Sequence, residues 1–125
     1  MKPYGRREVR EAVAYWRREL GFTDWTVRVV FRRMADRTTC EAMPEYKEVT
    51  FTFDLAKMHA NGDKLYRQVA HEFAHLPVWD LAEFAQTEAG HRDPVKARLF
   101  EKLEESTTTA LEHLILRLHP PPTDI

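Results

Sequence analysis

The feature that most constrains this chain of 125 residues is the pentapeptide His71-Glu-Phe-Ala-His75. Apolar residues recur around it at helical spacing, at Leu65, Val69, Phe73 and Leu76. Residues that are four apart on a helix lie on one face, one turn from each other. The pattern therefore predicts a helix from which two imidazoles point the same way.

Two imidazoles in this arrangement can bind one metal ion, and zinc suits them best. A catalytic zinc takes a third protein ligand and leaves its fourth position to water. Glu72 directly follows the first histidine, where a general base can take a proton from that water. The pattern indicates zinc-dependent hydrolysis of an amide, most commonly of a peptide.

The third ligand should come from an acidic helix that follows the motif. Asp93 as N-cap and Pro94 as first residue begin this helix, which runs to about Leu118. We expect its buried face to hold Phe100, Leu103, Thr107, Ala110, Leu114 and Leu118. Glu104 lies at the edge of that face, where a carboxylate is costly unless it is paired or binds a metal. Glu104 is therefore the predicted third ligand, with Glu105, Glu101 and His91 as rivals.

Other residues have roles that the sequence leaves open. A ligating histidine usually donates its second N–H to a carboxylate or carbonyl. Asp80 is the candidate acceptor of this hydrogen bond, although a helix-capping role after Pro77 is equally compatible with the sequence. Candidates for stabilising an oxyanion are Tyr46, Tyr66, His91 and His113. Cys40 is the only cysteine, and we expect a buried strand residue there, not a nucleophile.

The rest of the pattern predicts an α+β fold in a single domain, residues 1–125, with 119–125 as a flexible tail. A first helix should run from Arg6 to Leu20 and end at Gly21. Three strands are expected at Thr26–Phe31, Thr39–Met43 and Glu48–Phe53. Because short turns join them, an antiparallel meander is the simplest arrangement.

The helix that carries the motif should start after the break at Asn61-Gly62-Asp63. Pro77 removes a backbone hydrogen bond to the carbonyl of Phe73. The helix should therefore kink or end just past His75.

Composition narrows the class of partner. The chain is 43% hydrophobic and 31% charged with a net charge of -1, which is typical of a globular protein and gives no electrostatic footprint for nucleic acid. No apolar run resembles a signal peptide or reaches the length of a membrane span. We therefore expect a cytoplasmic protein that contacts no membrane and does not take nucleic acid as its main partner.

These residues together resemble the small single-domain zincins, especially the short gluzincin-like metallopeptidases of phages and bacteria. The specific part of the resemblance is Val69-Ala-His-Glu-Phe-Ala-His-Leu76. It is accompanied by Leu20-Gly-Phe-Thr-Asp-Trp25 before a strand, by Val49 to Phe53 before the motif helix, and by Glu104 in the last helix. The likeness covers most of the chain.

The resemblance implies a zinc ion bound by His71, His75 and a downstream glutamate, with Glu72 as the catalytic base. It implies a small sheet, of about three strands, packed on the motif helix and on a long C-terminal helix. It also implies a substrate cleft along an edge strand, which in this sequence would be Glu48–Phe53. An extended peptide would pair with the main chain of that edge.

The leading hypothesis is a zinc metallopeptidase acting on a peptide or protein substrate. An alternative is a zincin-like protein that binds zinc for recognition or regulation, but Glu72 argues against it because a structural site needs no general base. A third reading is a metal-free interaction protein whose last helix is the contact surface and whose stability zinc would not change. A variant of the first hypothesis is a DNA-associated protease resembling the SprT group. The lack of net positive charge argues against this variant, although Arg28, Arg32 and Arg33 could form a local basic patch.

Overall fold

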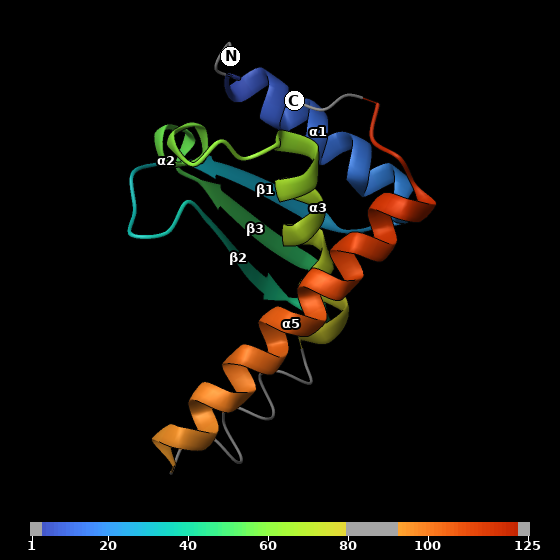
Figure 1. The fold of residues 1–125 in the computed structure, drawn as a ribbon. Helices are drawn as coiled ribbons and strands as arrows, with labels where there is room; N and C mark the ends of the chain where they lie inside the picture. The colour runs from blue at the N-terminus through green and yellow to red at the C-terminus, as the bar shows by residue number, and fades with distance from the viewer. Residues whose placement is uncertain (1–3, 80–92, 123–125) are drawn as a thin grey trace.

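The computed structural model describes residues 4–79 and 93–122 and has an α+β fold, as the sequence predicts (Figure 1). Its elements follow in the order α1 (Arg6–Glu19), β1 (Thr26–Phe31), β2 (Thr38–Met43), η1 (Pro44–Tyr46), β3 (Glu48–Phe53), α2 (Leu55–Ala60), α3 (Leu65–Ala74), η2 (Leu76–Val78) and α5 (Pro94–Leu118). The predicted first helix, three strands, motif helix and long last helix are all present. The short helix α2 is an addition that the periodicity did not indicate.

The sheet is mixed, so the expected antiparallel meander is wrong. The strand order is β1-β3-β2, with β1 parallel to β3 and β2 antiparallel to it. β3 is the central strand, and the sequence-based assignment of Glu48–Phe53 to an edge is wrong as well. Burial explains the order: Val49, Phe51, Thr52 and Phe53 are all buried, as in a strand covered on both faces, whereas β1 and β2 are only half-buried.

The loop from β1 to β2 crosses the end of β3 and sets where β2 begins. Asp54, the N-cap of α2, accepts hydrogen bonds from the amides of Lys57 and Met34. The ammonium group of Lys57 donates to the carbonyls of Met34 and Ala35. The loop is therefore tied to the start of α2, and Thr38, the first residue of β2, comes to lie beside α3.

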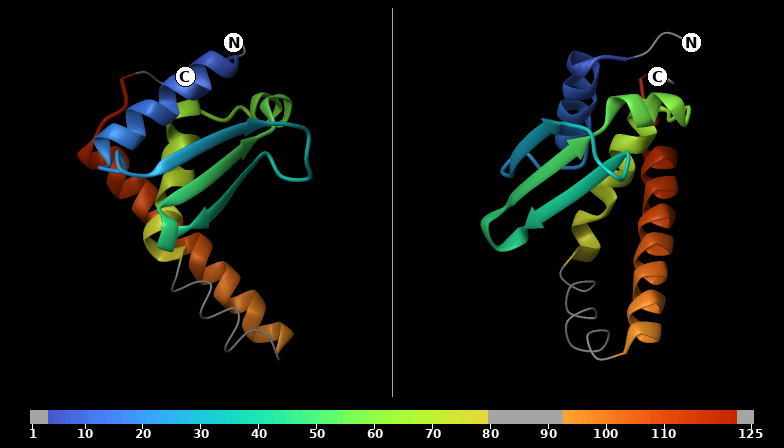
Figure 2. Two further views of the ribbon diagram at one scale, coloured as in Figure 1. Left: turned by 180° about the vertical axis from the view of Figure 1, so that it is seen from behind. Right: turned by 90° about the vertical axis from the view of Figure 1, so that its left-hand side faces the viewer.

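Helices α1 and α3 cover one face of the sheet, and α5 packs against α3 (Figure 2). The core lies between these layers. Phe51 of the central strand contacts Phe73 of α3, with ring centroids 4.8 Å apart. The indole of Trp16 is fully buried, and its Nε1 donates to the carbonyl of Tyr66, which ties α1 to α3.

The end of α3 follows the prediction from Pro77. The α-helix ends at Ala74, and a short 3-10 turn over Leu76–Val78 contains the proline. The break before the helix is also where the sequence indicates it, because Gly62 has a positive φ of 69°. His75 is thus the last residue that α3 can orient.

The long helix α5 starts as predicted, since the Asp93 carboxylate accepts a hydrogen bond from the amide of Val95. The prediction of its buried face is wrong. Leu103, Leu114 and Leu118 are exposed, and the side turned toward α3 carries Thr108 and Glu112 instead. Two stripes at helical spacing run along this helix, and the more polar one packs inward because the facing side of α3 is itself polar.

The chain beyond α5 returns to α1. The hydroxyl of Tyr15 donates to the carbonyl of Pro120, and His119 lies 3.4 Å from the carboxylate of Glu19. Within residues 4–79 and 93–122, no helix is long and apolar enough to cross a membrane.

We predict that Phe51→Ala lowers the free energy of unfolding by about 3–5 kcal/mol, because it leaves a cavity between the central strand and Phe73. Urea denaturation followed by circular dichroism measures the change. Tyr46→Ala is the control, since this aromatic is 67% exposed and its loss should change stability by less than about 0.5 kcal/mol. Equal effects of the two substitutions would contradict this account of the core.

Candidate metal centre

Helix α3 holds His71 and His75 side by side on its face toward α5. Their ring centroids are 5.1 Å apart, and both side chains are mostly buried. His71, Glu72 and His75 each offer a ligand atom, and these atoms lie within 4.8 Å of one another. The motif therefore has the convergent geometry that its spacing indicates.

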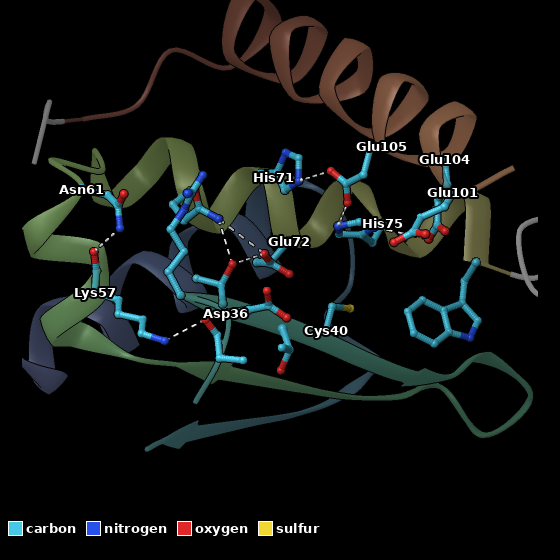
Figure 3. Close-up of a pocket in the computed structure, with 16 residues that line it drawn as sticks. Asp36, Cys40, Lys57, Asn61, His71, Glu72, His75, Glu101, Glu104 and Glu105 are labelled. Carbon is cyan, nitrogen blue, oxygen red and sulfur yellow. Dashed lines mark hydrogen bonds and ion pairs between the residues drawn. The ribbon is translucent and has the colours of Figure 1, made fainter. Parts of the chain in front are cut away.

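The carboxylate of Glu105, on α5, lies between the two imidazoles (Figure 3). One oxygen is 3.4 Å from Nε2 of His71, and the other is 3.5 Å from Nε2 of His75. With metal–ligand distances of about 2.0–2.1 Å, ligand atoms around a tetrahedral zinc are about 3.3 Å apart. Two nitrogens and a carboxylate at this separation fit the donor set and the size of a zinc site.

The second nitrogen of His71 contacts a carboxylate that the sequence analysis missed. Nδ1 of His71 is 2.9 Å from Oε1 of Glu112, and the other oxygen of Glu112 is 2.9 Å from Nε of Arg67. Burial alone would raise the pKa of Glu112, but these two hydrogen bonds outweigh it and lower the pKa. The hydrogen bond that His71 donates to Glu112 also raises the pKa of His71 against the effect of burial.

Glu112 occupies the position beside a ligating histidine where a carboxylate is usual. A signal for it is present in the sequence. Glu104, Thr108 and Glu112 follow each other at intervals of four, which makes a polar stripe along one side of α5. The apolar stripe on the other side of the helix obscured this pattern.

Glu104, the predicted third ligand, lies at the other nitrogen of His75. Its carboxylate is 3.7 Å from Nδ1 of His75, and the hydroxyl of Thr108 is 3.4 Å from the same atom. Burial and the nearby charges of Glu105 and Glu101 raise the pKa of Glu104. Burial also lowers the pKa of His75, which favours the neutral imidazole that a metal ligand requires.

The carboxylate of Glu72 is buried, with only 3% of the residue exposed. The hydroxyl of Thr38 donates to its Oε1 at 2.5 Å, and the amide of Gln68 donates both to that hydroxyl at 2.9 Å and to the same carboxylate oxygen at 3.4 Å. Burial raises the pKa of Glu72, although the hydrogen bond from Thr38 and the charge of His71 oppose the rise. Glu72 is therefore a stronger base than an exposed glutamate.

His71, Glu72, His75, Glu104 and Glu105 line a cavity of about 670 Å³ between β2, α3 and α5. Lys57 and Asn61 lie at one end of it, and Glu101 lies at the other (Figure 3). Trp79 also lines the cavity.

The other described residues that the sequence singled out do not gather at the centre. Cys40, on β2, is half-buried and lines the cavity, and burial raises the pKa of its thiol, which does not suit a nucleophile. Tyr46, Tyr66 and His113 are not among the residues that line the cavity. Asp80 and His91 lie outside the described residues.

We predict that Thr38→Val lowers the free energy of unfolding by about 1–3 kcal/mol, because the buried carboxylate of Glu72 loses its hydroxyl partner. Thr38→Ser keeps the hydroxyl and should retain most of the stability. Chemical denaturation of the metal-free protein measures both. A greater loss in Thr38→Ser than in Thr38→Val would show that the methyl group of Thr38, and not its hydrogen bond, is what matters.

Comparison with known proteins adds nothing to this geometry. No protein-family model, no curated protein and no solved structure matches the chain.

Proposed function

We propose that this chain is a zinc-dependent metallopeptidase whose zinc is held by His71, His75 and Glu105. The observation that carries the proposal is the position of the Glu105 carboxylate between the Nε2 atoms of both histidines, next to the buried carboxylate of Glu72. Two imidazoles and one carboxylate form a ligand set of catalytic zinc sites. Such a site differs from a purely structural one because it leaves a position for water.

Glu105 replaces Glu104 as our choice of third ligand. The carboxylate of Glu104 approaches Nδ1 of His75, whereas Glu105 approaches Nε2 of both rings. The two oxygens of Glu105 lie 3.4 Å and 3.5 Å from the two Nε2 atoms, so these three groups could share a single ion. Glu104 then orients His75, in the way that Glu112 orients His71.

The chemistry that zinc supplies when bound is a lowered pKa of water and a polarised substrate carbonyl. Glu72 accepts the proton of the attacking water. Its raised pKa favours this step, and both of its hydrogen bonds from Thr38 and Gln68 end on Oε1. Glu72 then delivers the proton to the leaving amine, so that one carboxylate acts first as base and then as acid.

A peptide substrate fits the edge of the sheet that borders the centre. β2 is an edge strand, and Thr38, Thr39 and Cys40 line the cavity beside the histidines. An extended peptide can add to such an edge through main-chain hydrogen bonds. We therefore assign to β2 the substrate-binding role that the resemblance implied for Glu48–Phe53.

Zinc binding distinguishes the two candidate glutamates. We expect wild-type protein to bind about one zinc, Glu105→Gln to weaken binding by more than about 100-fold, and Glu104→Gln by only about 10- to 100-fold, as for a residue that only orients a ligand. Competition with a chelator of known affinity measures this. Glu101→Gln, on the same helix, is the matched control and should bind as wild type does.

Loss of zinc in Glu104→Gln with binding retained in Glu105→Gln would restore Glu104 as the ligand. Absence of zinc binding by the wild type would refute the proposal. The hypothesis of a metal-free interaction protein would then be favoured.

Hydrolysis is tested with Glu72→Gln, which keeps the shape of the side chain but cannot accept the proton. We expect zinc-loaded wild type to cleave members of a peptide library, and Glu72→Gln to cleave at least about 100-fold more slowly while holding the same amount of zinc. Mass spectrometry of the products measures cleavage, with Glu45→Gln as the active control because Glu45 is exposed and does not line the cavity. If zinc-loaded wild type cleaves no peptide, the zinc-binding recognition protein becomes the better account.

A further inference from the structure

The outer side of α5 carries an apolar stripe that packs on nothing within the described residues. Val95, Leu99, Leu103, Leu114 and Leu118 are 77%, 54%, 53%, 47% and 65% exposed. They lie on the side of the helix opposite to Thr108 and Glu112, which face α3. The first part of α5 also extends beyond the ends of the strands (Figures 1 and 2). No residue of the described part of the chain therefore covers the stripe.

The spacing of this stripe is regular. Leu99, Leu103, Thr107, Ala110, Leu114 and Leu118 follow each other at intervals of four, four, three, four and four. This is close to an 11-residue repeat, which keeps one face of a helix in contact with a neighbouring helix over several turns. The order is the same when it is read from either end, with leucines at both ends and the small residues Thr107 and Ala110 in the middle.

We propose that this stripe is a homodimer interface in which α5 of one copy packs against α5 of a second copy. An interface around a twofold axis must be self-complementary, because each copy contributes the same patch. Leucines of the second copy can meet leucines of the first at both ends of the stripe. The small side chains in the middle let the two helix axes approach each other where they cross.

The area of the stripe can be compared with that of known interfaces. A fully exposed leucine offers on the order of 100 Å² of apolar surface, so the five exposed side chains offer on the order of 300 Å² per copy. Standard interfaces bury about 800 Å² per partner, of which somewhat more than half is apolar. The stripe supplies less apolar area than this, as in weak complexes. We therefore expect a weak dimer, with a dissociation constant between about 1 μM and 1 mM.

The dimer is independent of the metal, because the stripe faces away from His71 and His75. Sedimentation equilibrium of the full chain between about 1 μM and 1 mM, with and without zinc, should show the same monomer–dimer equilibrium. Leu103→Glu/Leu114→Glu should be monomeric throughout, because dimerisation would bury four carboxylates. Ala14→Glu adds a glutamate at an exposed position of α1, and this control should dimerise as wild type does.

Thermal unfolding checks that the double variant is folded, and Leu103→Gln/Leu114→Gln is the uncharged substitute if it is not. A wild-type protein that stays monomeric at about 1 mM overturns the proposal and leaves the stripe to a different partner. Dimerisation of the folded double variant with the affinity of the wild type overturns it as well. Neither result bears on zinc binding or hydrolysis.

Discussion

The buried carboxylate of Glu72 is the constraint on which the arrangement around α3 depends. A carboxylate that leaves water needs hydrogen bonds to replace the lost solvent, and Thr38 and Gln68 provide them. Gln68 comes from the preceding turn of the same helix, but Thr38 comes from β2. It reaches Glu72 because the β1–β2 loop crosses the end of β3 and is held there by Asp54. The strand order β1-β3-β2 is thus linked to the chemistry of the site, since it places β2 at the edge where a hydroxyl can face the carboxylate.

The contact between α3 and α5 is polar where most helix pairs are apolar. Glu112 and Thr108 are buried on α5, and they face His71 and His75. Buried polar groups stabilise little unless every member is satisfied, and apolar residues of similar size often serve stability better. Charged groups at this interface lower the stability of the helix pair but fix the positions of the histidines. Local loss of stability of this kind is typical of functional sites.

The sequence predicts those parts of the structure that local periodicity determines. Helix α1, the start of α5 at Pro94, the end of α3 before Pro77 and the convergence of His71 and His75 all follow from spacing and capping. Strand order does not, because three short strands can pair in several ways and only the burial of most of β3 favours its central position. The inward face of α5 could not be predicted either. Its stripe of leucines is the more apolar one, and the rule that apolar faces point inward fails here because the neighbouring side of α3 is polar.

The contacts that hold α5 in place differ along its length. Ile115 and Leu116 are its main apolar contacts with the core, and both lie near its C-terminal end. Further toward its N-terminus, its contacts with α3 are the polar ones at His71 and His75. Under the proposed function, a zinc ion shared by α3 and Glu105 would add a strong link at that point, and ligand binding that requires the folded state increases its stability by mass action. The metal would then serve the fold as well as the reaction, because it would hold α5 against α3 where the apolar core does not reach.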